Sequence, residues 1–357
     1  MNNNKKKQIL FLPKYSPSGA SSRYRIYQFL PYFEKEGISC VVSPLFDDQY
    51  FMRFNEGKKQ NIFHLFTCYL RRFVILFSIK KYDLVFIQYE LFPYFPFSLD
   101  SWFKKSKTKY VLDFDDAIFH NYDVIKPKFI SNLFKNKFKN LLINAEFVIT
   151  GSPYLTEYCN TFSSKVLEIP TVLAIDKYLI NDNKIEKDFV IGWIGSKSTS
   201  KYILDILPAL VEFSQLNICI IHLIGFDKSI KEINELKNVK LIDWTENTEV
   251  EEINKFSVGI MPLRDTNWEN GKCGFKLIQY MALGKPTIAT PLKANLKIDK
   301  NNSGLYAITN EEWVLRLKEI FKEKEKYVEV GHQNRKVIEL NYSINSVINQ
   351  YLNILKI

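Results

Sequence analysis

The chain has 357 residues, of which 46% are hydrophobic and 25% charged, and its net charge is +10 at pH 7. This composition excludes a disordered or low-complexity protein, and the length predicts two domains of about 150 to 180 residues. The five cysteines are scattered without a Cys-x-x-Cys pair, which favours a reducing cytoplasm and argues against a disulfide framework or a zinc site. The longest uncharged apolar run, residues 73–79, is too short to span a bilayer, and residues 8–13 are too short for a signal-peptide core. We therefore expect a protein that is neither exported nor transmembrane.

The positive charge is concentrated in the first half of the chain. Residues 1–170 contain 24 Lys and Arg against 15 Asp and Glu, or +9, whereas the remainder carries 25 against 24, or +1. This asymmetry predicts an acidic partner for the first half, either anionic lipid, a diphosphate-linked acceptor or nucleic acid. No nucleic acid is expected, because no RNA-recognition, KH or helix-turn-helix signature accompanies the charge.

Strand-like and helix-like segments alternate in the first half, as in a parallel α/β sheet. Strands are expected near residues 8–13, 39–44, 83–88, 109–114 and 146–151. Helices are expected near residues 22–36, 58–80, 127–144 and 153–161, while residues 94–107 remain unassigned. The Gly/Ser-rich loop after the first strand lacks the G-x-G-x-x-G pattern, so no dinucleotide-binding fingerprint is present.

Three carboxylates, Asp113, Asp115 and Asp116, end the fourth expected strand. Carboxyl ends of parallel strands border the ligand crevice of an open α/β sheet, and stability does not require three like charges at one strand end. We therefore expect them to hold an acceptor hydroxyl, to accept its proton, or to orient a neighbouring cation.

Residues 58–81 form a basic segment rich in aromatic side chains, and a second aromatic cluster follows at residues 91–97. Packing of an amphipathic helix on the sheet explains both. The alternative is a face that lies on a membrane, with aromatic side chains at the interface and cations on anionic headgroups. These cations are Lys58, Lys59, Arg71, Arg72, Lys80 and Lys81.

Residues 171–187 become polar and indicate a linker between a first domain, residues 1–170, and a second, residues 188–342, before a closing helix at 343–357. The second domain begins with a strand-like run that ends at Gly195. Hydroxyl side chains and two lysines then enter a helix, an arrangement typical of an anion site. Its residues include Ser196, Lys197 and Lys201.

Residues 258–291 are predicted to form a strand, a loop, a helix and a second strand. Gly271 and Gly274 would let the backbone approach a ligand, and Lys272 and Lys276 add charge that suits a diphosphate. Packing of an ordinary strand–helix–strand unit would explain the apolar residues of the helix. It would not explain the two glycines and two lysines.

The pattern Lys276-x-x-Gln279-Tyr-Met-Ala-x-Gly284-x-Pro286-x-Ile-Ala-Thr290 resembles the nucleotide-binding signature of family 4 glycosyltransferases, including the bacterial cell-surface polysaccharide type. The resemblance implies the α/β GT-B fold, with two Rossmann-like domains whose parallel sheets face each other across a cleft. In that family a Glu-x7-Glu motif spans this stretch, and here Gly271 and Gln279 occupy the two Glu positions. It implies that Gln279 holds the nucleotide ribose and that backbone groups and Glu269 contact the donor sugar.

Further site residues follow from the same resemblance. It implies that Lys201 and Lys276, together with backbone amides from Gly271 to Phe275, stabilise the leaving diphosphate without a metal ion. Ser196 and Lys201 have the spacing of an Arg and a Lys that clamp the diphosphate in the family. The other implied donor-binding residues are Gly19, Ser21, Arg23, Gly195, Lys197, Asn247, Lys272, Cys273 and Gly274. The closing helix would cross back to the first domain.

The resemblance implies a retaining hexosyltransferase that uses a nucleotide-diphosphate sugar as substrate and needs no cofactor. The acceptor would be a glycan or a polyprenyl-diphosphate-linked sugar, and the enzyme would work in the cytoplasm or peripherally on the inner face of the plasma membrane. Because the first Glu and the Arg of the family pattern are missing, a non-catalytic GT-B scaffold that binds nucleotide or glycan stays open. A nucleotide-sugar epimerase is a third possibility.

Overall fold

The computed structural model describes residues 6–55, 57–96, 100–123, 125–180, 188–301 and 303–356. The chain divides into two compact units, each described here by itself. Unit 1 comprises Met1–Thr171, Gly271–Cys273 and Val347–Ile357, and unit 2 comprises Val172–Asn270 and Gly274–Ser346. Of the expected linker, residues 181–187 lie outside the described residues, whereas Val172 and Leu173 are buried within unit 2.

Unit 1 contains a six-stranded parallel sheet with the order β2-β1-β3-β4-β5-β6. Its strands are β1 (Gln8–Leu12), β2 (Ser39–Val42), β3 (Leu84–Gln88), β4 (Tyr110–Phe114), β5 (Phe147–Thr150) and β6 (Val166–Glu168). The central strands β3 and β4 are buried at every position, which explains their nearly continuous apolar sequence. All five strands expected in this half are present, and the short β6 is additional.

The helices of unit 1 are more broken than the apolar spacing predicts. They are α1 (Ala20–Arg25), α2 (Leu30–Lys35), α3 (Asp48–Asn55), α4 (Ile62–Leu76), α5 (Asp100–Ser106), α6 (Lys128–Phe134), α7 (Lys137–Asn144) and α8 (Pro153–Asn160). Short 3-10 turns cover Tyr27–Phe29, Ile79–Lys81 and Ile118–Asn121. The helix expected over 22–36 is two helices, because Pro31 lacks a backbone N–H and begins a new helix at its first turn. Helix α4 begins at Ile62 because the side chain of Asn61 caps its first turn.

Aromatic rings dominate the core of unit 1. Phe11 stacks on Phe33 with ring centroids 5.8 Å apart, and Phe29 lies 4.6 Å from Tyr351. Tyr351 belongs to α17 (Ile344–Leu355), whose residues from Val347 onward are part of unit 1. The C-terminal helix therefore completes the core of the first sheet.

Unit 2 contains a second six-stranded parallel sheet with the order β12-β11-β10-β7-β8-β9. Its strands are β7 (Phe189–Ile194), β8 (Cys219–Ile224), β9 (Val239–Ile242), β10 (Val258–Met261), β11 (Thr287–Ala289) and β12 (Leu305–Tyr306). From β7 the chain winds outward to β9 and then crosses back to β10 on the other side of β7. The strand order thus reverses between β7 and β10, where open α/β sheets bind ligands at the carboxyl ends of their strands.

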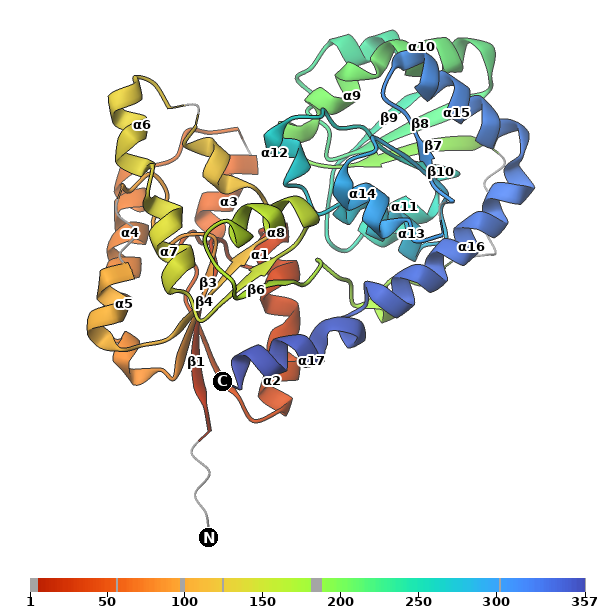
Figure 1. Ribbon diagram of the computed structural model, residues 1–357. Coiled ribbons are helices and arrows are strands. Elements are labelled where there is room, and N and C mark those ends of the chain that lie inside the picture. Colours follow the sequence, from red (N-terminus) through yellow and green to blue (C-terminus); the bar gives the residue numbers. More distant parts are fainter. Residues whose placement is uncertain are drawn as a thin grey trace. The chain divides into compact units, whose positions relative to one another are not determined.

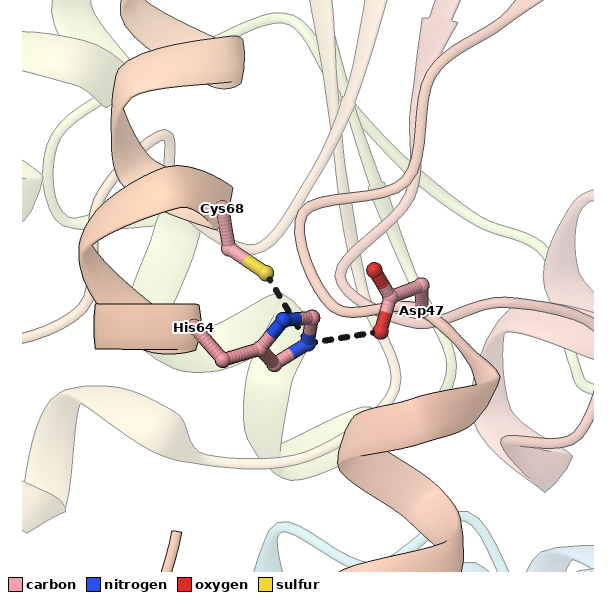
Figure 2. Close-up of side chains that lie close together, drawn as sticks. All are labelled: Asp47, His64 and Cys68. Atoms are coloured by element: carbon pink, nitrogen blue, oxygen red, sulfur yellow. Dashed lines mark hydrogen bonds and ion pairs between the residues drawn. The ribbon is translucent and has the colours of Figure 1, made fainter. Parts of the chain in front are cut away.

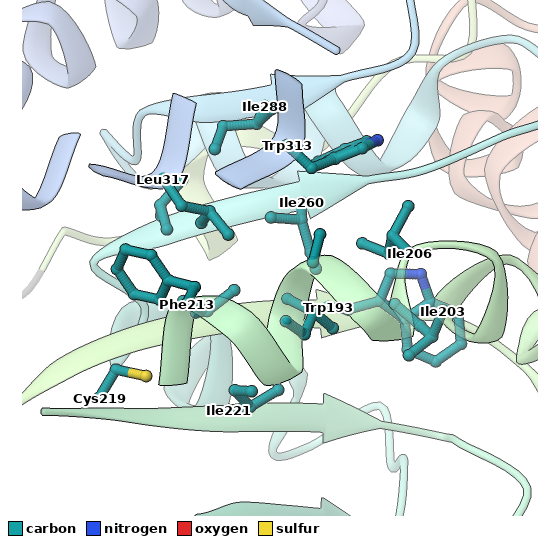
Figure 3. Packing of buried hydrophobic residues seen from close by; sticks show 14 of the residues in the cluster. Trp193, Ile203, Ile206, Phe213, Cys219, Ile221, Ile260, Ile288, Trp313 and Leu317 are labelled. Carbon is teal, nitrogen blue, oxygen red and sulfur yellow. The ribbon is translucent and has the colours of Figure 1, made fainter. Parts of the chain in front are cut away.

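The helices of unit 2 are α9 (Lys201–Asp205), α10 (Leu207–Leu216), α11 (Glu249–Asn254), α12 (Asn267–Asn270), α13 (Phe275–Ala282), α14 (Lys293–Ile298), α15 (Asn310–Lys322) and α16 (Lys324–Asn341). Short 3-10 turns cover Ile175–Lys177, Lys197–Thr199 and Glu232–Glu235. Helices α10 and α15 lie side by side (Figure 1). Phe213 of α10 and Trp313 of α15 belong to the same buried apolar cluster as Trp193 of β7 (Figure 3). Among the described residues, no helix combines the length and the apolar character that crossing a membrane requires.

Candidate active site

The candidate site in unit 2 lies at the carboxyl ends of β7 and β10, where the strand order reverses. Strand β7 ends at Ile194 and the chain turns sharply at Gly195. A Cβ atom at Gly195 would lie 2.2 Å from the Trp193 ring, so only glycine permits this turn. Ser196 then caps the following 3-10 turn, and its backbone N–H donates to Thr199 Oγ1 at 2.9 Å. Ser196 and Lys197 are both exposed.

A buried carboxylate lies next to Lys201 in this site. Glu269 of α12 is 3% exposed, and its Oε1 lies 3.9 Å from Lys201 Nζ and accepts a hydrogen bond from Tyr202 Oη at 2.5 Å. Thr266 donates to its other oxygen. Burial acts to raise the pKa of Glu269, but the hydrogen bonds from Thr266 and Tyr202 outweigh it and hold the pKa below its ordinary value. The site therefore contains an ionised carboxylate that orients a half-exposed lysine.

Helix α13 supplies the other lysine of the site. Its N-cap, Gly274, has φ +68°, and a Cβ there would lie 2.4 Å from Ile298 Cδ1, so this position requires glycine. Lys276 follows in the first turn of α13, with its Nζ 6.0 Å from the ring centroid of the buried Trp193. Phe275, the first residue of α13, is half-buried. The positive end of α13 and a lysine thus occupy the same turn.

Gln279 lies in a buried polar network in unit 2. It is 4% exposed, and its Nε2 donates to Glu249 Oε1 at 2.7 Å and contacts Tyr178 Oη at 3.2 Å. Glu249 also accepts from Tyr178 Oη at 3.0 Å and from Trp244 Nε1 at 2.6 Å. A glutamate at position 279 would face another carboxylate at hydrogen-bond distance. The amide donor at this position therefore matches its buried partner Glu249.

A hollow of about 390 Å³ opens beside the ends of β10, β11 and β12. Its lining includes Thr290, Trp313 and the ion pair of Arg264 with Asp205, whose two hydrogen bonds both measure 2.7 Å. Its volume is within the range of small-molecule sites, roughly 300 to 1,000 Å³. Asn247, expected near a nucleotide base, is exposed between β9 and α11.

In unit 1 the three carboxylates at the end of β4 have different surroundings. Asp113 is fully buried and receives two hydrogen bonds from the buried guanidinium of Arg25. Asp115 accepts from Ser21 Oγ at 2.8 Å, and burial followed by the neighbouring Asp116 carboxylate raises the pKa of Asp115 to about 6. Asp116 pairs with Lys272 at 2.8 Å within the same unit. Asp113 thus orients a cation, and Asp115 titrates near neutral pH.

Of the three residues expected after β1, Gly19 is the N-cap of α1 and Ser21 and Arg23 lie within α1, and only Ser21 joins this polar network. Ser21 contacts Asp115, Tyr89 Oη at 2.8 Å and Gln88 Nε2 at 2.7 Å. Arg23, by contrast, is 8% exposed and donates to the Pro17 carbonyl at 3.0 Å.

The remaining expected residues lie in tightly packed segments of unit 1. Gly19 is the N-cap of α1, and a Cβ there would lie 2.5 Å from Tyr15 Cβ. The Gly271 carbonyl accepts from Ser152 Oγ at 3.4 Å, and burial raises the pKa of the Cys273 thiol to about 11. The thiol is therefore neutral at physiological pH.

Several residues of these networks were not anticipated from the sequence, notably Tyr202, Thr266, Glu249 and Arg25. Thr266 and Glu269 have the S/T-x-x-E spacing that precedes many helices, so that pair could have been found by its capping pattern. The hydrogen bond of Gln279 to Glu249 joins residues 30 positions apart, so no short sequence motif indicates it.

Residues 188–322 match the family model described as Glycosyl transferases group 1. No curated protein matches the chain.

Solved structures resemble the chain over nearly its whole length. Sucrose-phosphate synthase from Thermosynechococcus elongatus aligns at a TM-score of 0.70 and 13% identity, covering 98% of both chains. A glycosyltransferase from Rickettsia africae ESF-5 aligns at 0.71 and 14%, covering 99% of this chain and 98% of its own. Anabaena HepE in complex with UDP and glucose aligns at 0.72 and 13%, covering 98% and 99%. The expected fold class is confirmed: the chain has the GT-B fold, and its residues 188–322 match the group 1 glycosyl transferases.

Proposed function

We propose that the protein is a family 4 hexosyltransferase that moves a sugar from a nucleotide-diphosphate donor, with retention of configuration, to a glycan or polyprenyl-diphosphate-linked acceptor. The product would enter a cell-surface polysaccharide. The reaction forms a bond from the acceptor oxygen to the anomeric carbon and breaks the bond from that carbon to the diphosphate. The protein must therefore stabilise the charge that develops on the departing diphosphate.

The proposal rests chiefly on the pair of lysines at the switch point of unit 2. Lys201 begins α9 and Lys276 lies in the first turn of α13, the helices that follow the two strands flanking the reversal in strand order. Two ammonium groups and backbone amides at these turns suit a diphosphate better than a neutral ligand. Since Anabaena HepE is described in complex with UDP and glucose, UDP-glucose is the first donor to test.

The acceptor is assigned to unit 1 on the strength of Asp115. A carboxyl group whose pKa is about 6 can take a proton from an acceptor hydroxyl near neutral pH and release it again. Ser21 fixes its orientation at 2.8 Å. In this proposal Asp113 acts on the reaction only by holding Arg25 in place.

An anionic membrane surface is proposed as the place where unit 1 meets its acceptor. Helix α4 exposes an apolar face that includes Phe63, Phe66 and Val74 at 83%, 65% and 58% exposure. Only Cys68, Arg72 and Leu76, at consecutive four-residue intervals, are buried in this helix. Patches of this kind, flanked by cations, mark membrane contact sites.

The cations expected to flank that face divide into two groups. Lys58, Lys59, Arg71, Lys80 and Lys81 are exposed, and Arg71 also pairs with Asp47. Arg72 is 1% exposed and donates to the Pro13 and Ser43 carbonyls at 2.8 and 3.0 Å, so it cannot reach lipid. Ring contacts hold α4 against α5, with Phe77 and Trp102 centroids 5.0 Å apart (Figure 1).

A panel of nucleotide sugars, assayed by released nucleoside diphosphate and by thermal shift, tests the donor assignment. Turnover supports the transferase, and a thermal shift without released diphosphate supports the scaffold alternative. Conversion of the donor sugar without an acceptor supports the epimerase.

Liposome flotation tests the membrane assignment. Wild-type protein should float with acidic vesicles at low salt and detach at high salt. A Phe63→Ser/Phe66→Ser variant should lose most of this binding. The matched control, Ile218→Ser/Leu340→Ser, replaces residues of unit 2 with 82% and 76% exposure and should float like wild type. Equal flotation of both variants would refute a role for α4.

A further inference from the structure

Three side chains with different donor atoms converge in unit 1, away from the carboxylates after β4. His64 and Cys68 lie one turn apart on the same face of α4, and Asp47 lies just before α3 (Figure 2). His64 Nε2 is 2.9 Å from Asp47 Oδ1 and 3.6 Å from Cys68 Sγ. All three donor atoms lie within 4.8 Å of one another. One imidazole nitrogen thus faces both a carboxylate and a thiol.

Hydrogen bonds alone cannot satisfy both contacts of this nitrogen. If Nε2 carries a proton, it donates to Asp47 and leaves the Cys68 sulfur as a weak acceptor. If Nε2 is unprotonated, it can accept from the thiol, but it then faces the carboxylate oxygen with no hydrogen between them. A cation among the three atoms would be contacted favourably by all of them.

The distances fit a zinc ion with little movement. Around a tetrahedral zinc with Zn–S near 2.3 Å and Zn–N and Zn–O of about 2.0–2.2 Å, N and S ligands lie about 3.6 Å apart and N and O ligands about 3.4 Å apart. The observed N–S separation is 3.6 Å, and the N–O separation of 2.9 Å is shorter. Zinc would therefore need Asp47 to withdraw by roughly half an ångström.

The surroundings also suit a metal ion. Cys68 is 1% exposed in an apolar cluster with Leu45 and Phe46, which lowers the local dielectric. The side chains of His64 and Asp47 are 14% and 31% exposed, so an ion and a water ligand can enter from this side. Arg71 Nη1 lies 3.6 Å from Asp47 Oδ2, the oxygen that does not face His64. Ligating carboxylates are commonly oriented in this way by a neighbouring donor.

We propose that Asp47, His64 and Cys68 bind a divalent transition-metal ion, zinc by the chemistry of the nitrogen, oxygen and sulfur donors, with water as the fourth ligand. The ion joins α4 to the segment between β2 and α3. No step of sugar transfer passes through it. Its presence therefore does not depend on the proposed function.

Metal titration of the full chain tests this site. Protein stripped with EDTA should bind one equivalent of Co²⁺ with visible d–d bands and a near-ultraviolet sulfur-to-cobalt charge-transfer band. Zn²⁺ should displace it and raise Tm. Cys68→Ala should weaken binding at least about 100-fold, since even changes to groups that only orient a ligand cost 10–100-fold. Cys159→Ala, which removes another buried thiol of unit 1, should bind like wild type.

Two results would overturn the proposal: wild-type protein that binds no stoichiometric Co²⁺ or Zn²⁺, or Cys68→Ala with unchanged affinity. Should Cys68→Ala fail to fold, Asp47→Asn provides the same comparison from a partly exposed position. It should weaken Co²⁺ binding about 10-fold or more while leaving the charge-transfer band of the saturated protein in place. Unchanged affinity in Asp47→Asn would equally exclude the site.

Discussion

Both units contain a six-stranded parallel sheet, but the strand orders differ and the charged and apolar groups are placed differently. In unit 2 helices α10 and α15 contribute to one large buried apolar cluster, and Lys201 and Lys276 lie in the first turns of α9 and α13. In unit 1 an arginine and an aspartate pair at 1% and 0% exposure, while phenylalanines of α4 face solvent. The fold thus fixes where a site can lie, at the carboxyl ends of the strands. The nature of the ligand then depends on which side chains surround those strand ends and cover the outer helices.

The largest expected effect concerns the buried ion pair of unit 1. Asp113→Asn leaves the guanidinium of Arg25 buried without its charge partner and should lower the free energy of unfolding by about 3–5 kcal/mol. In unit 2, Asp205→Asn breaks the pair with Arg264, whose side chains are 36% and 50% exposed, and should cost less than about 1 kcal/mol. Urea denaturation followed by circular dichroism measures both. Equal losses would remove the contrast between the units.

A charge exchange tests the buried network of unit 2. Gln279→Glu places a carboxylate against Glu249 and should destabilise the fold by about 2–4 kcal/mol at pH 7, with a smaller loss at acidic pH, where one carboxyl takes up a proton. Adding Glu249→Gln restores one carboxylate and one amide and should recover most of the loss. A double variant no more stable than the single one would show that Gln279 has another role.

The pH dependence of stability should distinguish Asp115 from its neighbours. Because its folded-state pKa of about 6 lies above the ordinary value of 3.8, the folded protein binds more protons than the unfolded chain between these values. The contribution of this group to stability is fully present below pH 4 and is lost as the pH rises through 6. Asp115→Asn should therefore remove this dependence and raise the free energy of unfolding at pH 7 by about 2–3 kcal/mol. Thermal melts from pH 4 to 8 measure it, and a wild-type profile in the variant would contradict the assignment.

The smallest expected effect on stability concerns Lys276, whose replacement should mainly affect ligand binding. Lys276→Ala should leave stability nearly unchanged and weaken nucleoside diphosphate binding by about 1.5–3 kcal/mol, the scale of a charged hydrogen bond. Calorimetric titration with UDP and GDP measures it. Lys240→Ala, an exposed lysine on β9, is the control and should bind like wild type. Unchanged affinity in Lys276→Ala would remove this residue from the donor site.

The strands were predictable because buried parallel strands are continuous apolar runs between turn residues, as in β7 and β10. The three-residue β6 and helix α3, in which four of eight residues are polar, were not predicted. Helix ends depended on single residues, such as Pro31 in α2 and Asn61 before α4. Boundaries were therefore less accurate than the elements themselves.

From the sequence, the candidate sites could be located only to the ends of strands and the starts of helices. The sequence indicated which turns carry Lys201 and Lys276, because strand ends in such sheets are predictable. It did not indicate that Asp113 faces Arg25, since these residues are 88 positions apart. The proximity of Asp47, His64 and Cys68 was not predicted for the same reason: Asp47 precedes His64 by 17 residues and lies outside α4.

The buried side and the exposed side of helix α4 are subject to different sequence constraints. The line of Cys68, Arg72 and Leu76 carries the contacts that fix the helix. Arg72 donates through Nη2 to the Pro13 and Ser43 carbonyls and through Nη1 to the Leu91 carbonyl at 3.5 Å, which uses the forked geometry of arginine. Replacement of Arg72 by lysine is therefore not conservative. The exposed aromatic side chains contribute little to folding. Substitutions at these positions should therefore be tolerated unless the side chains bind a partner. If related sequences keep Cys68, Arg72 and Leu76, selection for stability explains it. If they also keep aromatic residues on the exposed side, selection for binding is needed as well.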